Sequence, residues 1–281
     1  MKIGVSGASG QLGAATVREL KARGARVVGI SRTPEAVQGA DEARFGDYDR
    51  AESLAAAYAG LDSVLIIPTT DLRPGIRGKQ NVTAIDAAVA AGVDRTVFVS
   101  SAGTRDVPEP DVWASYYAAE QRLMRTAPKW SILRMNYYAE ALAQEAQASL
   151  AHGAITGLAE NRVAFVSRDD LAAAAAGLLL GEGHDGAIYT GTGPASLSGA
   201  ERAEIIARVA GKPLGFLVLP GEALAEGMSK AGLPDVVVNT VLSIQQGFAV
   251  GGFDIVTGDI ERLSGNPPKS LEQILRATLA Q

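Results

Sequence analysis

The sequence of 281 residues contains no cysteine and only two histidines, His152 and His184. The lack of cysteine excludes disulfides, thiolate metal ligands and thiol nucleophiles. The two histidines lie far apart in the chain, each beside a glycine where a turn is favoured, so they do not suggest a metal site. Neither has a nucleophile elbow nearby, which argues against a Ser-His-Asp hydrolase.

Long apolar runs and a strong charge imbalance are also missing. No stretch approaches the apolar length of a membrane span. The net charge of −5 argues against a general nucleic-acid-binding protein. The chain is 47% hydrophobic and 20% charged, a globular mixture. A strand expected almost at the first residue leaves no room for a signal peptide, so we expect a cytoplasmic protein.

Glycine is abundant, and three glycines near the N-terminus are regularly spaced in Gly7-Ala-Ser-Gly10-Gln-Leu-Gly13. The motif follows an apolar run at 2–6, typical of a buried parallel strand, and precedes a helical pattern that ends at Gly24. In such a turn Gly7 allows the sharp bend, Gly10 lets the backbone approach a pyrophosphate, and Gly13 lets the helix lie close to the sheet. This context favours a dinucleotide site over a plain tight turn.

Strands and helices are expected to alternate over the first half of the chain. We expect further strands at 26–30, 43–45, 63–67, 95–99 and 130–134, and helices at 50–59, 77–91 and 113–125. This alternation predicts an α/β fold with a Rossmann-type, doubly wound parallel sheet.

The second half is less regular, and we interpret it as a smaller C-terminal α+β lobe. It has expected helices near 136–151, 168–180, 198–210 and 221–247 and after Pro268, with short strands near 163–166, 187–190 and 214–219. We therefore expect an NAD(P)-binding domain at 1–151 and a substrate-side lobe at 152–281, with interleaved lobes and an approximate boundary.

The residues that end the strands indicate the type of dinucleotide, because ligands of such sheets lie across the carboxyl ends of the strands. The second strand ends without the carboxylate that favours NAD; Ser31 and Arg32 stand there and are suited to a 2′-phosphate. The alternative for Arg32 is an ordinary solvated loop arginine. We therefore expect NADPH as the cofactor.

Further contacts follow from the same argument. Asp47 and Tyr48 are expected to border the adenine, and the segment 68–70 to run beneath the nicotinamide half. Ser100 or Ser101 is expected to contact the nicotinamide ribose or a substrate oxygen, with strand capping as the alternative. The cofactor contacts expected up to this point are Gly7, Ser9, Gly10, Gln11, Leu12, Ser31, Arg32, Asp47, Tyr48, Pro68, Thr69, Thr70, Ser100 and Ser101.

Several segments together resemble one known family. They are the glycine motif, Gly46-Asp47-Tyr48, Ile132-Leu-Arg134 with Tyr138 after it, Gly183-His184 before Tyr189, and Gly265-Asn-Pro-Pro-Lys-Ser-Leu271. The chain resembles the NmrA-like atypical short-chain dehydrogenases, close to the bacterial NADPH-dependent quinone reductases and triphenylmethane reductases. The resemblance implies hydride transfer from NADPH to a flat conjugated acceptor. It also implies that Asn136, Tyr137 and Tyr138 lie beside the nicotinamide.

One departure from the wider superfamily concerns its Tyr-x-x-x-Lys pair, in which the lysine lowers the pKa of the tyrosine. Here Tyr116 is followed by Glu120, and Tyr117 by Gln121. A carboxylate in this place is expected to raise the pKa of a neighbouring phenol, which disfavours the usual alcohol–ketone chemistry. Hydride delivery to a quinone-like acceptor does not need this pair, because conjugation stabilises the product anion and water can protonate it.

The candidate catalytic residues are accordingly Tyr116, Asn136 and Tyr138, with packing in a pocket wall as the alternative role of Tyr116. The favoured function is an NADPH-dependent reductase of a small planar conjugated substrate, without nucleic acid or membrane, as a monomer or homodimer. The alternative is an NADP(H)-binding redox-sensing regulator that acts through a protein partner. A sugar-nucleotide epimerase or dehydratase is weaker, because that chemistry depends on the tyrosine–lysine pair.

Overall fold

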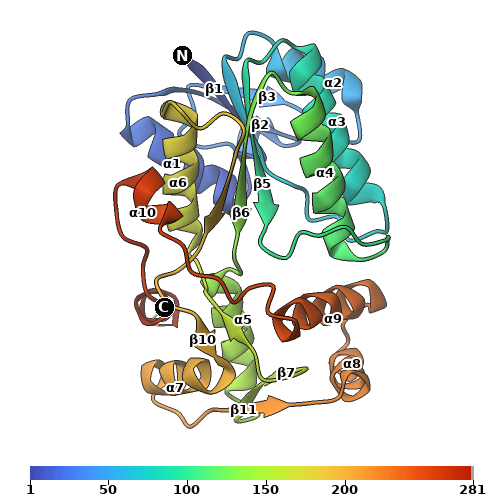
Figure 1. Ribbon diagram of the computed structural model, residues 1–281, viewed down its shortest axis with the longest axis vertical. Helices are drawn as coiled ribbons and strands as arrows, with labels where there is room; N and C mark the ends of the chain where they lie inside the picture. Colours follow the sequence, from blue (N-terminus) through green and yellow to red (C-terminus); the bar gives the residue numbers. More distant parts are fainter. Residues whose placement is uncertain (280–281) are drawn as a thin grey trace. The chain divides into compact units, whose positions relative to one another are not determined.

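The computed structural model describes residues 1–279, which divide into two compact units (Figure 1). Unit 1 comprises Met1–Met135, Arg168–Gly191 and Asp259–Asn266, and unit 2 comprises Asn136–Ser167, Thr192–Gly258 and the chain from Pro267 onward. The chain therefore passes between the units several times. The boundary expected near residue 151 lies inside the first segment of unit 2.

Unit 1 contains a seven-stranded parallel sheet in the order β3-β2-β1-β4-β5-β6-β9. Its strands are β1 (Lys2–Ser6), β2 (Arg26–Ser31), β3 (Glu42–Phe45), β4 (Ser63–Ile66), β5 (Arg95–Ser101), β6 (Lys129–Met135) and β9 (Ala187–Gly191). The central strands are apolar and almost fully buried, as both faces of a parallel sheet require. The doubly wound Rossmann-type fold predicted from the sequence is confirmed.

Helices cover both faces of this sheet (Figure 1). They are α1 (Gln11–Ala22), α2 (Ala51–Tyr58), α3 (Ile76–Ala90), α4 (Val112–Thr126), α6 (Arg168–Leu180) and α10 (Asp259–Ser264), with a short 3₁₀ turn at Pro34–Ala36. One layer is formed by α1, α6 and α10, and the other by α2, α3 and α4. The carboxyl ends of β1, β2, β4 and β5 thus open into the loops that lead to α1, the 3₁₀ turn, α3 and α4.

The helix and strand expected at 168–180 and 187–190 form as α6 and β9, and both belong to unit 1. β9 pairs in parallel with β6, with Leu133 opposite Tyr189. Periodicity had identified the two elements but not their partner, because pairing between distant strands leaves no local pattern.

Unit 2 is a smaller α+β assembly with two two-stranded sheets, one parallel (β7–β11) and one antiparallel (β8–β10). Its elements are α5 (Ala139–Ser149), β7 (Ala154–Gly157), β8 (Arg162–Val163), β10 (Leu197–Ser198), α7 (Gly199–Ala210), β11 (Gly215–Val218), α8 (Gly221–Lys230), α9 (Asp235–Ala249) and α11 (Leu271–Leu279).

The helical stretch expected at 221–247 is in fact two helices, α8 and α9. Gly232 between them has a φ of +84°, and Pro234 is the N-cap of α9. A left-handed glycine ends a helix and proline cannot continue one, so these two residues were the signal for the break. β7, β10 and α10 were not expected from the sequence, because each is too short to show a clear period.

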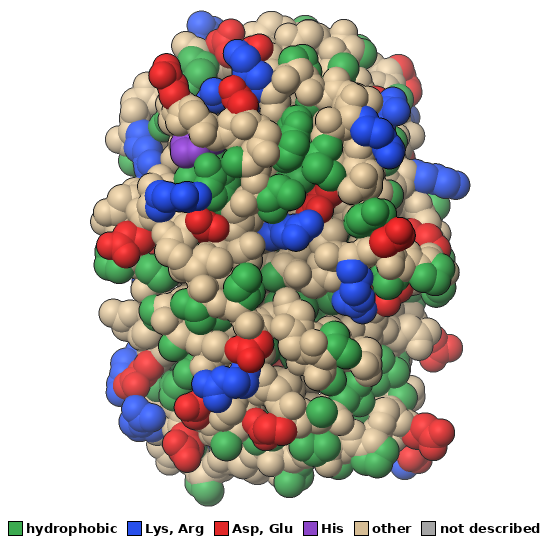
Figure 2. All heavy atoms as spheres, in the orientation of Figure 1, with side chains coloured by type: hydrophobic (Ala, Val, Ile, Leu, Met, Phe, Trp, Pro, Cys, Tyr) green, Lys and Arg blue, Asp and Glu red, His purple; other side chains and the backbone are tan. Residues whose placement is uncertain are grey.

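Within residues 1–279, no helix combines the length and the apolar character needed to cross a bilayer. On the face shown in Figure 2, lysine and arginine side chains alternate with aspartate and glutamate, and hydrophobic side chains lie among them. This face therefore has no extensive area of a single charge.

Candidate functional site

The glycine turn between β1 and α1 has the geometry expected of a dinucleotide-binding turn. Gly7 has a φ of +96°, and the backbone N–H groups of Gly7 and Ala8 donate to the Ile30 carbonyl at 2.9 and 3.1 Å. A Cβ on Gly13 would lie 2.1 Å from the Gly7 carbonyl oxygen, so only glycine lets α1 approach this closely. A Cβ on Gly10 would meet nothing nearer than that same oxygen at 3.3 Å, so the protein leaves space beside Gly10.

The N-terminus of α1 is suited to an anion. Gly10 is the N-cap, no side chain caps the helix, and its first turn contains no acidic residue. The first N–H groups of a helix have no partner within the helix and carry partial positive charge, so they bind phosphate oxygens readily. Gln11, which is exposed, and Leu12, which is buried, are the first two residues of this turn. The residues present therefore fit a pyrophosphate.

The end of β2 brings hydroxyl groups and an exposed cation next to this turn. The hydroxyl oxygens of Ser31 and Ser9 are 2.7 Å apart, and the Ser31 oxygen accepts from the backbone N–H of Thr33 at 3.0 Å. Arg32 is exposed and has no ion pair within residues 1–279. This set of hydroxyls and one guanidinium is chemically suited to the phosphate expected here.

Tyr48 points its phenol into unit 1. Its hydroxyl donates to Ser6 Oγ at 2.8 Å and to the Ile67 carbonyl at 3.2 Å, and the same serine lies 3.1 Å from the hydroxyl of Tyr58. Burial raises the pKa of Tyr48 to about 12, and the hydrogen bond with Ser6 opposes this rise. Asp47 is more exposed, with its carboxylate accepting from Asp49 N at 3.1 Å. The expected adenine contacts of both residues stay predictions.

Side-chain hydrogen bonds join the segment after β4 to α3. The Thr69 hydroxyl donates to Oε1 of Gln80, and the amide of Gln80 donates to Asp49 at 3.0 Å. Asp71, the next acidic residue, accepts from Arg73, whose guanidinium holds the pKa of that carboxyl well below its usual range. Of the segment expected beneath the nicotinamide, Pro68 and Thr69 are half-buried and Thr70 is exposed.

Glu120, in the position of the superfamily lysine, belongs to a buried polar cluster. Its side chain is 1% exposed and accepts from Arg134 at 2.8 and 2.6 Å and from Ser100 Oγ at 2.6 Å. Ser100 is also 3.1 Å from the Thr104 hydroxyl, and Ser101 is buried. The cluster links β5, α4 and β6. The cofactor contacts expected of the two serines stay predictions.

Tyr116 is 7% exposed, and its ring lies 6.3 Å from that of Trp113. Its pKa is raised, as the sequence led us to expect, but the main cause is burial and not Glu120. The guanidinium of Arg77 lies 5.7 Å from the centre of the ring and lowers the same pKa. Sequence reasoning missed Arg77, although a cation in the first turn of a helix opposes the helix dipole and was an available signal.

The three residues expected after β6 belong to unit 2. Asn136 is 1% exposed; its Nδ2 donates to the Phe253 carbonyl at 3.1 Å and its Oδ1 accepts from Tyr137 N at 2.7 Å. The Tyr137 ring meets Phe248 edge-on at 5.1 Å. Tyr138 is the half-buried N-cap of α5. The amide of Asn136 therefore holds the segment that follows β6, and the catalytic and cofactor roles of the three residues stay predictions.

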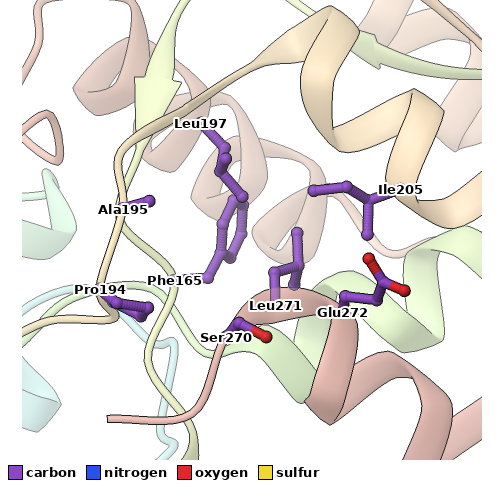
Figure 3. A pocket seen from close by; sticks show the side chains of 8 residues that line it. All are labelled: Phe165, Pro194, Ala195, Leu197, Ile205, Ser270, Leu271 and Glu272. Carbon is purple, nitrogen blue, oxygen red and sulfur yellow. The ribbon is translucent and has the colours of Figure 1, made fainter. Parts of the chain in front are cut away.

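Unit 2 also contains a small hollow of about 170 Å³ (Figure 3). The lining residues are Phe165, Pro194, Ala195, Leu197, Ile205, Ser270, Leu271 and Glu272. None of them is an expected site residue, and the Glu272 carboxylate is bound by Arg276 and Arg208. We do not assign the redox chemistry to this hollow.

A metal centre finds no support in the part of the chain that the structure describes, residues 1–279, where no group of three or more acidic or histidine side chains could hold an ion. The groups at the glycine turn and the end of β2 in unit 1 are glycines, helix N–H groups, hydroxyls and one arginine. Such a set binds phosphates.

Comparisons with known proteins agree with this reading of unit 1. Quinone oxidoreductase 2 of Escherichia coli is 28% identical over 281 residues, covering 96% of each chain. Among solved structures, an E. coli NADPH-dependent quinone oxidoreductase complexed with NADPH has a TM-score of 0.90 at 27% identity, covering 99% of this chain and 100% of that one.

A second solved structure, the Citrobacter triphenylmethane reductase complexed with NADP(H), has a TM-score of 0.89 at 26% identity, covering 98% of this chain and 99% of that one. The resemblance to NmrA-like reductases that the sequence motifs indicated is thereby confirmed. The sequence profile described as NAD(P)H-binding matches residues 7–182, well over half of the chain. With its glycine turn, open helix N-terminus and parallel sheet, this chain belongs to the NAD(P)H-binding family.

Proposed function

We propose that this protein is an NADPH-dependent reductase that transfers hydride to a quinone or a similar conjugated acceptor. The single observation that carries the proposal is the pairing of the open α1 N-terminus with the exposed Arg32 and the Ser9–Ser31 pair at the end of β2. The relatives named above support it, because they are quinone and triphenylmethane reductases that cover nearly the whole chain.

Each part of this site has a separate task in binding. The N–H groups at the start of α1 hold the pyrophosphate. Arg32 and the neighbouring serine hydroxyls hold the 2′-phosphate by charge-assisted hydrogen bonds. When bound, NADPH supplies a hydride to the acceptor. Unit 1 carries the cofactor. The roles of Asn136, Tyr137 and Tyr138 beside the nicotinamide, which the family resemblance implies, are part of the proposal.

The chemistry does not need a tyrosine–lysine proton relay. Glu120 is bound to Arg134 and Ser100, so no cation stands in the lysine position. Burial raises the pKa of Tyr116 and thus makes its phenol a weaker proton donor. A conjugated acceptor tolerates this arrangement, because its product anion is delocalised and takes its proton from water.

The proposal is tested by titrating the purified protein with NADPH and NADH and by following NADPH absorbance with a panel of neutral quinones and dyes. We expect tighter binding of NADPH than NADH and consumption of NADPH with at least one quinone. The folded Gly10→Val variant should lose dinucleotide binding, because a branched side chain fills the space needed by the pyrophosphate.

Two outcomes would contradict the proposal in different ways. Unchanged affinity in a folded Gly10→Val protein would remove the dinucleotide site. Tight NADPH binding without turnover of any acceptor would favour the alternative, an NADP(H)-binding redox sensor that acts through a protein partner. The proposal also includes that the protein acts in the cytoplasm, that it is a monomer or homodimer, and that it does not bind nucleic acid.

A further inference from the structure

Arg77 is a half-buried cation that interacts with Asp71 and Tyr116 within unit 1. Its Nε donates to the Asp71 carbonyl oxygen at 3.1 Å, and its guanidinium lies 5.7 Å from the centre of the Tyr116 ring. A guanidinium over an aromatic face at this distance is attracted by the ring quadrupole. The position of the charge is therefore set by Tyr116, whose ring and hydroxyl both interact with the guanidinium, and by the backbone of Asp71.

The charge of Arg77 is not neutralised by a neighbour. Within residues 1–279 it forms no ion pair. The Asp71 carboxylate is bound by Arg73 and lies 3.5 Å from the Gln80 amide, and Glu109 accepts from the backbone N–H of Gly75 at 3.1 Å. A first-turn arginine also adds its charge to the positive end of the α3 dipole, and that turn has no acidic residue. Such a placement is unfavourable for the helix alone, so it points to a use outside the helix.

Arg77 lies next to the segment that we propose beneath the nicotinamide. Gln80, one turn further along α3 on the same side, accepts from the Thr69 hydroxyl in that segment. Tyr116, on the neighbouring helix α4, lies beneath the guanidinium. The cation is thus at the carboxyl edge of the sheet, where ligands of this fold bind.

We propose that Arg77, seated on the ring of Tyr116, selects neutral carbonyl acceptors over cationic ones by stabilising the negative charge that hydride transfer places on the acceptor oxygen. This inference rests on the proposed reductase function and adds to it the charge class of the substrate. Tyr116 then serves as a platform for Arg77 and not as a proton donor.

Charge balance explains the selection. A neutral quinone that receives a hydride, with its two electrons, becomes a hydroquinone monoanion, NADPH becomes NADP⁺, and water supplies the proton that gives the hydroquinone. A nearby guanidinium stabilises that developing anion. A cationic triarylmethane dye that receives the same hydride becomes a neutral leuco dye. The guanidinium therefore repels the dye before the reaction and has no developing negative charge to stabilise during it.

The activity test compares kcat/KM for a neutral quinone and a cationic triarylmethane dye. In Arg77→Met we expect the quinone value to fall about ten- to a hundredfold, the usual effect of losing a charge-assisted hydrogen bond, while the dye value stays level or rises. Arg77→Lys should recover part of the quinone rate. Tyr116→Ala removes the platform and should behave like Arg77→Met.

Arg262→Met is the matched control, because that guanidinium also lies on a tyrosine ring, 4.7 Å from the centre of Tyr189, but on α10 in the other helix layer. It should leave both rates unchanged. An equal loss for quinone and dye in Arg77→Met, or no loss for the quinone, would overturn the proposal.

A binding measurement separates this inference from the reductase function. 4-Nitrophenol is a flat probe whose anion resembles the product anion, and its ionisation is read from its absorbance. Bound to the wild type with NADP⁺, it should ionise at a lower pH than when bound to Arg77→Met, with the Arg262→Met protein matching the wild type. If no acceptor is turned over, the reductase function fails while this titration still tests Arg77; equal ionisation in wild type and Arg77→Met would refute the anion-stabilising role.

Discussion

Arg32 allows a direct test of the preference for NADPH over NADH. Its side chain is exposed and forms no ion pair within the described chain, so it is available to bind a phosphate. Arg32→Ala should raise the dissociation constant for NADPH about ten- to a hundredfold, since a charge-assisted hydrogen bond contributes about 1.5–3 kcal/mol to binding. NADH, which lacks the 2′-phosphate, should bind as before. Fluorescence titration with both cofactors measures the two dissociation constants.

Arg50, another exposed arginine of unit 1, provides a control for the Arg32 measurement, because within residues 1–279 its guanidinium forms no ion pair and lies 6.0 Å from the centre of the Phe45 ring. Arg50→Ala should leave the ratio of the two affinities unchanged. If Arg32→Ala lowered the affinities for NADPH and NADH equally, Arg32 would order the loop and would not bind the phosphate.

Tyr116→Phe should retain most of kcat, because the raised pKa and the bound state of Glu120 leave no activated proton donor. Positioned acid catalysis is worth about 10²–10⁴-fold where it operates, and no loss of that size is expected. Substitution of Asn136 should lower kcat more, because its amide holds the segment that carries Tyr137 and Tyr138. Steady-state kinetics with saturating NADPH measures these effects; a thousandfold loss of kcat in Tyr116→Phe would disprove the relay-free mechanism.

In unit 1, α6 packs tightly against α10 at Gly177. A Cβ there would lie 1.9 Å from the Leu263 carbonyl oxygen, which belongs to backbone and cannot move aside easily. Gly177→Ala should therefore lower the free energy of unfolding by about 1–3 kcal/mol, the usual cost of overpacking. Denaturant unfolding followed by circular dichroism measures this change.

Gly227 in α8 is the matched comparison, since a Cβ there would meet nothing within 4 Å. Gly227→Ala should leave stability unchanged or raise it by about 0.5–1 kcal/mol, because alanine loses less conformational entropy in a helix. A stable Gly177→Ala protein would show that α10 can shift away from α6 at little cost.

Unit 1 as a whole should lose stability in alkali through its buried phenols. Burial raises the pKa of Tyr48 to about 12 in the folded chain, against 10.0 for an ordinary tyrosine. Its contribution is fully present below pH 10.0 and is lost as the pH rises through about 12, because the unfolded chain releases the proton first. Between pH 10.0 and about 12, the free energy of unfolding of Tyr48→Phe should fall less steeply than that of the wild type, by about 1.4 kcal/mol per pH unit. Urea unfolding across this window tests the slope, and parallel curves for the two proteins would contradict it.

At the scale of the whole chain, local pattern was enough for the first half of the fold. The glycine spacing, the alternation of strands and helices, and the Ser31-Arg32 pair are read from residues close together in sequence. Those features correspond to β1, α1, β2 and the turns between them, because steric limits on the backbone and the periodicity of burial act locally.

Contacts between distant residues were decided only by the tertiary structure. β9 joins β6 as the seventh strand, Glu120 is bound by Arg134, and Arg77 lies on the ring of Tyr116. Hydrophobic periodicity states that a strand or helix face is buried, but many partners satisfy that requirement equally. Packing of the whole chain selects one of them, and by that selection a lone arginine on α3 becomes the cation beside Tyr116.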